Sequence, residues 1–339
     1  MKDQFFYLTV IYPGLKNPKH KIDVFLQPLI GELQSLWTDG VATFDAALKR
    51  NFRLRAALMW TISDFPAYSM LSGWSTAGKL ACPHCMDDSD AFHLPNGSKT
   101  SWFDNHRKFL PAGHTYRNNK RNFLRNTTVT KDPPDVKTGY EIIQEIEQLG
   151  LVKITEVGGE EHNARICRVT GCGWKKRSVF WDLPYWSSNL IRHNLDVMHI
   201  EKNFFDNVFN TVMCVPDKTK DNLKAREDLK LFCHRPDQDW DETEGKYPKV
   251  AYQLDKDAVQ AIAQWVKELK FPDGFVSNMS RCVDANKGTF RAMKSHDCHV
   301  FLQRLMPIAF KPFLPDHVWG PLTELCLFFK DLTSATLSE

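Results

Sequence analysis

The chain lacks a long hydrophobic run, and this absence excludes several classes of protein. Its N-terminal apolar stretch, residues 5–12 (FFYLTVIY), is far shorter than the roughly 20 residues that a membrane-spanning helix needs. The stretch carries no signal-peptide cleavage pattern, and no other segment approaches a transmembrane length. The sequence therefore predicts no membrane partner and a location inside the cell.

A strong excess of charge of either sign is also absent. The 339 residues include 44 Lys and Arg against 41 Asp and Glu, which gives a net charge of only +3. Any affinity for nucleic acid must therefore come from local clusters of cations. With 42% hydrophobic and 25% charged residues, the composition is that of an ordinary globular protein, and the length favours one large domain or two lobes.

Closely spaced cysteines are rare in this chain. Nine cysteines in 339 residues do not make a disulfide scaffold, and only Cys82 and Cys85 have a CxxC spacing. Two thiolates across such a turn form half of a tetrahedral zinc site, while two buried, inert thiols are an equally good interpretation. Further candidate ligands are a weaker cysteine pair and three nearby histidines: Cys167, Cys172, His84, His106 and His114.

Apolar patterns predict a mixed α/β N-terminal part and a helical C-terminal part. Residues 5–12 and 54–62 read as two adjacent strands of one sheet, with a helix over 22–37 packed against it. Helical spacing follows at 141–149, 201–213, 220–232, 257–269, 291–308 and 322–332, with Asp257 as the N-cap of the fourth of these segments. The predicted organisation is an N-terminal domain over 1–130, a linker or insertion over 131–180 and a helical lobe over 181–339.

Asp64 lies where the second predicted strand ends, before Phe65 and Pro66. A carboxylate at the end of a rigid strand is suited to hold Mg²⁺ or Mn²⁺, and two such ions can catalyse phosphodiester chemistry. The local pattern favours a simpler role, because Asp before Phe-Pro-Ala is a common helix N-cap.

Residues 105–131 contain many cations and no acid. Aromatic residues are interleaved with them, as in proteins that bind a phosphate backbone and stack on bases. A solvated loop would have a similar composition, so this alternative stays open. The candidate nucleic-acid-binding residues are Arg107, Lys108, Arg117, Lys120, Arg121 and Arg125.

A polar pattern also occurs in residues 192–203 (RHNLDVMHIEKN). Asp196, His199 and Asn203 have the spacing of one helix face. This face could bind metal or phosphate, but a hydrogen-bonded network that fixes helix packing is favoured. Residues 294–299 (KSHDCH) suggest a second network of this kind.

Several of these motifs, in this order, resemble one family. The blocks are 61–68 (TISDFPAY), 71–76 (LSGWST), 82–85 (CPHC), 106–111 (HRKFLP), 183–186 (LPYW), 192–203 and 293–299. They are similar to conserved blocks of the plant CACTA-type (En/Spm) DNA transposases, and the resemblance runs over nearly the whole chain.

The resemblance implies a partial RNase H-like core that holds Mg²⁺ or Mn²⁺ with two Asp and one Glu, with Asp64 as the second Asp. It also implies a zinc site in which Cys82 and Cys85 supply one half and a downstream His pair the other. Transposon-end DNA, self-association and a nuclear location are implied as well. The family's first Asp, its His pair and its Glu have no match in this sequence, so we expect a transposon-derived chain that is catalytically incomplete.

Two other functions compete with this one. A domesticated remnant would bind DNA or protein without chemistry. A zinc-dependent hydrolase unrelated to transposons is disfavoured, because no open site with three ligands is visible in the sequence.

Overall fold

A computed structural model describes residues 8–11, 17–102, 105–123, 127–233, 235–272, 278–334 and 336. The chain forms two compact units, and each draws on separate stretches of sequence. Unit 1 comprises Met1–Phe92, Thr100–Gly113 and Val129–Leu195. Unit 2 comprises His93–Lys99, His114–Thr128 and Asp196–Glu339. The predicted boundary at 130 lies beside the change of unit between Thr128 and Val129, whereas no change of unit lies at 180.

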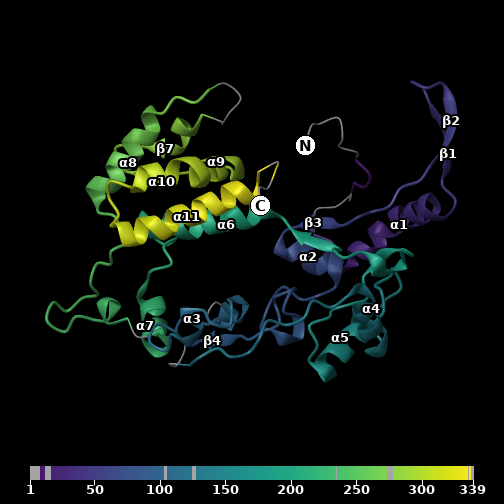
Figure 1. Cartoon of the computed structure of the whole chain (residues 1–339), viewed down its shortest axis with the longest axis horizontal. Coiled ribbons are helices and arrows are strands. Elements are labelled where there is room, and N and C mark those ends of the chain that lie inside the picture. Colours follow the sequence, from purple (N-terminus) through teal and green to yellow (C-terminus); the bar gives the residue numbers. More distant parts are fainter. Residues whose placement is uncertain are drawn as a thin grey trace. The chain divides into compact units, whose positions relative to one another are not determined.

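Unit 1 combines helices with short strands (Figure 1). Its helices are α1 (Ile22–Thr38), α2 (Phe65–Ser72), α4 (Gly139–Gln148) and α5 (Glu160–Thr170). Its strands are β1 (Val41–Asp45), β2 (Arg50–Leu54), β3 (Thr61–Ser63) and β6 (His193–Leu195). The short strands β4 (Phe92–Leu94) and β5 (Lys99–Ser101) pair with each other and follow Cys82 and Cys85 in sequence.

Unit 2 is mostly helical, as predicted for the C-terminal part. Its helices are α3 (Thr115–Asn118), α6 (Val197–Val212), α7 (Leu223–Phe232), α8 (Lys256–Glu268), α9 (Ser295–Val300), α10 (Met306–Phe310) and α11 (Asp316–Leu332). A π-helix, Phe301–Leu305, joins α9 to α10, and β7 (Val283–Asp284) pairs with β8 (Thr289–Phe290). The N-cap of α8 is Asp255, which accepts a hydrogen bond from Ala258 N, and not Asp257 as predicted.

The sheets differ from the predicted pair of strands. In the described part of the chain, each sheet has two strands. β3 pairs in parallel with β6, with Thr61 opposite His193 and Ser63 opposite Leu195. Residues 8–11 of the first predicted strand are irregular and exposed, while the rest of that segment lies outside the described residues. Most of 54–62 is irregular too, and only its end forms β3.

Some apolar residues of 54–62 pack into the core of unit 1 without forming a strand. Ala57 and Leu58 pack beside the buried Ile30 of α1 and the aromatic segment around the 3₁₀ helix Val179–Asp182. The predicted helix over 22–37 is confirmed as α1. It packs against the 3₁₀ helix Val179–Asp182 and not against the predicted sheet. Residues 131–180 belong to the core as well, because Ile142, Ile146 and Leu151 are buried with Trp74 and Trp174.

The core of unit 2 is a single apolar cluster. Phe205 and Phe209 of α6 stack at 4.9 Å, and both contact Phe301 of the π-helix edge to face. Residues of α8, α10 and α11 complete the cluster. Helical spacing predicted these segments because each of the longer helices buries one apolar face.

Candidate functional site

Asp64 ends β3 and begins α2. Its Oδ1 atom accepts a hydrogen bond from Ala67 N at 2.8 Å, and Pro66 lies in the first turn of the helix. The N-cap interpretation of Asp64 is therefore confirmed. Within the described part of the chain, Asp64 belongs to no group of three potential metal ligands.

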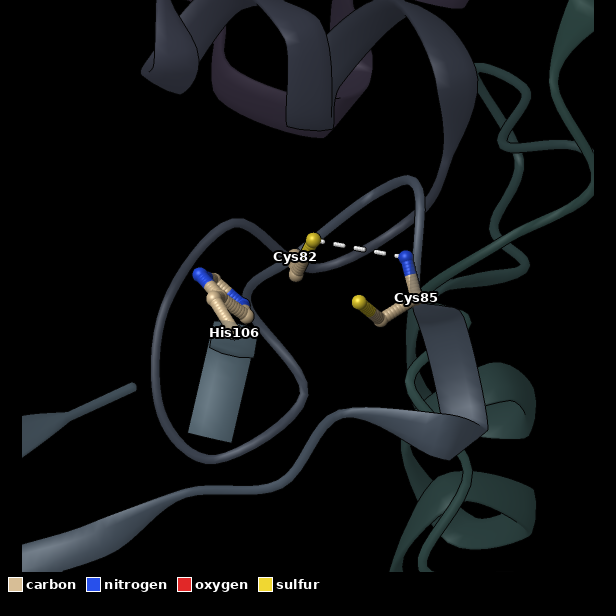
Figure 2. Close-up of side chains that lie close together, drawn as sticks. All are labelled: Cys82, Cys85 and His106. Atoms are coloured by element: carbon tan, nitrogen blue, oxygen red, sulfur yellow. Dashed lines mark hydrogen bonds between the residues drawn. The ribbon is translucent and has the colours of Figure 1, made fainter. Parts of the chain in front are cut away.

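Three potential metal ligands lie close together in unit 1. Figure 2 shows the Cys82 and Cys85 side chains with that of His106, which comes from the 3₁₀ helix Asn105–Phe109. One ligand atom from each residue lies within 4.8 Å of the others. The CPHC turn is held by a hydrogen bond from Cys85 N to Cys82 Sγ at 3.3 Å and one from Met86 N to Cys82 O at 2.9 Å.

Burial acts on two of these three ligands. Cys85 is buried, and burial, followed by its interactions with Cys82, raises the pKa of its thiol to about 11. Burial also lowers the pKa of His106, and the His106 Nε2 atom is buried without a hydrogen-bond partner. An unpaired buried imidazole nitrogen beside two thiols is the donor set of a Cys₂His zinc site.

This arrangement adds one ligand to the predicted half-site. Spacing identified Cys82 and Cys85, but it could not choose among the nearby histidines. His84 and His114 join no group of three potential ligands in the described residues, and neither do Cys167 and Cys172. The Cys167 thiol instead donates to the Trp174 carbonyl at 2.7 Å.

The predicted nucleic-acid-binding residues separate into buried and exposed cations. Arg107, Lys108 and Arg117 are buried, with exposed fractions of 4%, 0% and 3%. Lys108 Nζ donates to Asp88 O at 2.7 Å and to Asp90 Oδ2 at 3.0 Å, so its charge is neutralised internally. Because burial withdraws these three side chains from solvent, they are not available to a phosphate backbone. Lys120 and Arg121 are exposed, and Arg125 lies outside the described residues.

The predicted network of Asp196, His199 and Asn203 is replaced by a different one. Asp196 is the N-cap of α6 and accepts from Met198 N at 2.9 Å, while Asn203 is exposed. The residue of this motif that joins a buried network is Glu201, which is 0% exposed.

Glu201 connects the two polar motifs of unit 2. Its Oε2 atom lies 2.6 Å from His299 Nδ1, and its Oε1 atom accepts from Gln303 Nε2 at 2.9 Å. Gln303 also donates to Thr333 Oγ1 at 2.8 Å, which ties α6 and the π-helix to the end of α11. Residues 294–299 thus contribute to a network, as predicted, through His299. Sequence spacing missed Glu201 because its partners lie about a hundred residues away.

With this geometry established, comparison with known proteins identifies a related family. Residues 1–149 match the model of the transposase family tnp2. No curated protein and no solved structure matches the chain.

The match covers the residues that the metal-site geometry brings together. Asp64, Cys82, Cys85 and His106 all lie within residues 1–149, as do Lys120 and Arg121. This part of the chain is therefore similar to the transposase family tnp2. Among the described residues, none of the helices is long and apolar enough to cross a membrane.

Proposed function

We propose that this chain is a transposon-derived, DNA-binding protein of the plant CACTA (En/Spm) type. The observation that carries the proposal is the tnp2 family match over residues 1–149, which includes the Cys82, Cys85 and His106 cluster. Transposases act on DNA, and a nuclear location follows from that substrate. A tagged chain that stays out of the nucleus would contradict the location.

An RNase H-like core is the fold that we propose for the transposase part. β3 and β6 are parallel neighbours, and each is followed at once by a helix whose N-cap is an aspartate. Parallel strands with crossover helices are the building units of α/β sheets. This arrangement supports the proposal, although each sheet in the described part has two strands.

Zinc is the metal that we propose for the cluster of Cys82, Cys85 and His106. These residues would hold the ion with three of its four ligands and link the CPHC turn to the helix Asn105–Phe109. Metal analysis of the purified chain should find about one zinc per molecule. His106→Ala should lower this content, whereas His84→Ala, in the same turn, should retain it. Equal zinc content in both variants would exclude His106 as a ligand.

DNA contact is assigned to the exposed cations Lys120 and Arg121. Each phosphate contact releases counterions, so losing both cations should weaken binding to any duplex. The slope of log affinity against log salt concentration should become shallower by about two, or about one for each lost contact. The test is a salt titration of the Lys120→Gln, Arg121→Gln double variant by fluorescence anisotropy. A matched control is Lys49→Gln with Arg50→Gln, which removes two exposed cations of unit 1. Equal salt slopes in both double variants would contradict the assignment.

We do not expect this chain to cleave a DNA strand by itself. Two-metal chemistry needs several carboxylates around both ions, and Asp64 belongs to no group of three potential ligands in the described part of the chain. A cleavage assay with Mg²⁺ or Mn²⁺ should therefore show binding without cutting. Cutting that disappears in Asp64→Asn would show that a catalytic site is complete within the chain.

A further inference from the structure

Unit 1 contains a cavity of about 210 Å³ whose walls include several large aromatic side chains. Tyr68, Trp74, Trp174 and Trp181 line it, together with the cations Lys137 and Arg192, and no acidic residue is among its lining residues. Pro83 and His84 of the CPHC turn form another part of the wall.

The floor of this cavity is rigid. Trp74 and Trp174 are 2% and 3% exposed, and their rings meet edge to face at 5.0 Å. The indole N–H of Trp74 donates to Leu80 O at 2.9 Å, and that of Trp174 donates to Glu145 Oε1 at 2.8 Å. Because packing and hydrogen bonds fix both rings, the cavity is preorganised for a ligand.

Two hydrogen-bond donors on the wall have no acceptor in the part of the chain that the structure describes. Trp181 Nε1 is buried without a partner, unlike the other two indoles of the cavity. Burial raises the pKa of Tyr68 to about 12, so its hydroxyl remains a donor at neutral pH. A buried donor without an acceptor costs free energy, and a ligand that accepts its hydrogen bond recovers that cost.

The two cations of the cavity differ in their partners. Lys137 Nζ lies 2.5 Å from Glu145 Oε2 and 3.4 Å from Asp87 Oδ2, so its charge is neutralised. The Arg192 guanidinium donates to the Asn189 carbonyl at 2.6 Å and lies 5.9 Å from the Trp181 ring centroid. Within the described residues, no carboxylate forms an ion pair with Arg192. Arginine thus supplies an uncompensated positive charge beside an aromatic ring.

These features favour one kind of ligand. The aromatic walls suit a flat ring, the unpaired donors suit a ring that carries acceptors, and the uncompensated arginine suits a negative charge close to that ring. A nucleotide has this chemistry, because its base stacks and its phosphate pairs with arginine. We propose that the cavity binds one unpaired nucleotide of DNA, with the base against the aromatic wall and the phosphate near Arg192. This site rests on the proposed DNA binding and adds to it a preference for locally unpaired DNA.

The test compares two fluorescein-labelled DNAs, a fully paired duplex and the same duplex with one unpaired adenine, in anisotropy titrations of the full chain. We expect roughly tenfold tighter binding of the DNA with the unpaired adenine, the size of one base-stacking contact. Arg192→Gln and Tyr68→Phe should each reduce this preference, whereas the Arg50→Gln control, an exposed cation of β2, should keep it. Tyr68→Phe removes only a hydroxyl, so it tests the cavity even where Arg192→Gln disturbs folding.

Each outcome has a definite meaning. Equal affinity of the unaltered chain for both DNAs overturns the nucleotide site and leaves the proposed DNA binding intact. A preference that persists in both cavity variants, with folding confirmed by circular dichroism, also overturns it. Binding to neither DNA rejects this site together with the proposed function. Binding to the DNA with the unpaired adenine alone supports the site and removes the assignment of duplex binding.

Discussion

A buried ion pair is the main residue-scale feature of unit 1 outside the cavity. Lys176 Nζ lies 2.6 Å from Asp23 Oδ1, and the side chains are 0% and 1% exposed. Burial lowers the pKa of Lys176 and raises that of Asp23, so desolvation opposes both charges. Buried pairs therefore contribute little net stability, although the loss of one partner is costly.

We predict that Lys176→Met destabilises the fold by about 3–5 kcal/mol, because it leaves a buried carboxylate without its cation. The double variant Lys176→Met, Asp23→Leu should recover most of this loss. The control is Lys153→Met, which breaks a half-exposed pair with Asp182 and should cost about 1 kcal/mol or less. Urea unfolding measures all three, and a double variant no more stable than Lys176→Met would contradict the argument.

His193 makes the stability of unit 1 depend on pH. Burial lowers the pKa of His193 from 6.5 to about 3, with a smaller contribution from Arg192. Below pH 6.5 the unfolded chain binds a proton that the folded chain excludes, so this contribution to stability is lost as pH falls toward 3. We predict a loss of about 2 kcal/mol between pH 6.5 and 5, from about 1.4 kcal/mol per pH unit. Denaturant unfolding at both pH values should show a smaller loss in His193→Gln than in His317→Gln, a variant of an exposed histidine.

Among the elements, helices could be predicted from sequence more reliably than strands. Thr138 and Glu141 form a capping box at the start of α4, and α6 buries Phe205 and Phe209 on one face, which are local signals. The hairpin of β1 and β2 was missed because β2 is exposed along its whole length and has no alternating pattern. The helix α5, within the predicted linker or insertion over 131–180, is also only weakly apolar.

The candidate sites show the same division between local and distant signals. The CxxC spacing predicted the paired thiols, because a two-residue gap brings both sulfurs to one turn. His106 and the Glu201–His299 pair depend on tertiary contacts over about 20 and 98 residues, which no local period encodes. The burial of Arg107 and Lys108 was not predictable either, because a run of cations reads the same whether its side chains face solvent or internal acceptors.

Helix α2 offers a way to separate the capping role of Asp64 from a metal-binding role. We predict that Asp64→Ala destabilises the protein by about 1 kcal/mol, whereas Asp64→Asn keeps the cap and costs almost nothing. Asn cannot supply a negative charge to a metal ion, so the two variants diverge only if capping is the role of Asp64. Thermal unfolding measures the difference, and equal destabilisation by both variants would show that the charge of Asp64 matters in the fold.

At the scale of the whole molecule, the two units interleave in sequence, which no contiguous change of composition revealed. Residues 93–99 and 114–128 belong to unit 2 although unit 1 surrounds them in sequence. Asp228 of α7 shows what holds the first of these segments in place. It is 3% exposed, and it accepts hydrogen bonds from Asn96 N at 2.9 Å, Asn96 Nδ2 at 3.0 Å and Gly97 N at 2.8 Å.

We therefore predict that a fragment of residues 196–339 folds around its phenylalanine core but loses order in α7. The core residues lie within 205–329 and need no part of unit 1, whereas Asp228 of α7 loses the three hydrogen bonds that it accepts from Asn96 and Gly97. Hydrogen bonds to a charged group contribute about 1.5–3 kcal/mol each, so their loss is enough to open a ten-residue helix locally. Hydrogen exchange should show faster exchange of α7 amides in the fragment than in the full chain, with α8 unchanged. Asp228→Ala in the full chain, which removes the acceptor and the buried charge together, should lie between the two. Equal protection of α7 in fragment and full chain would mean that the segment 93–99 contributes nothing to unit 2.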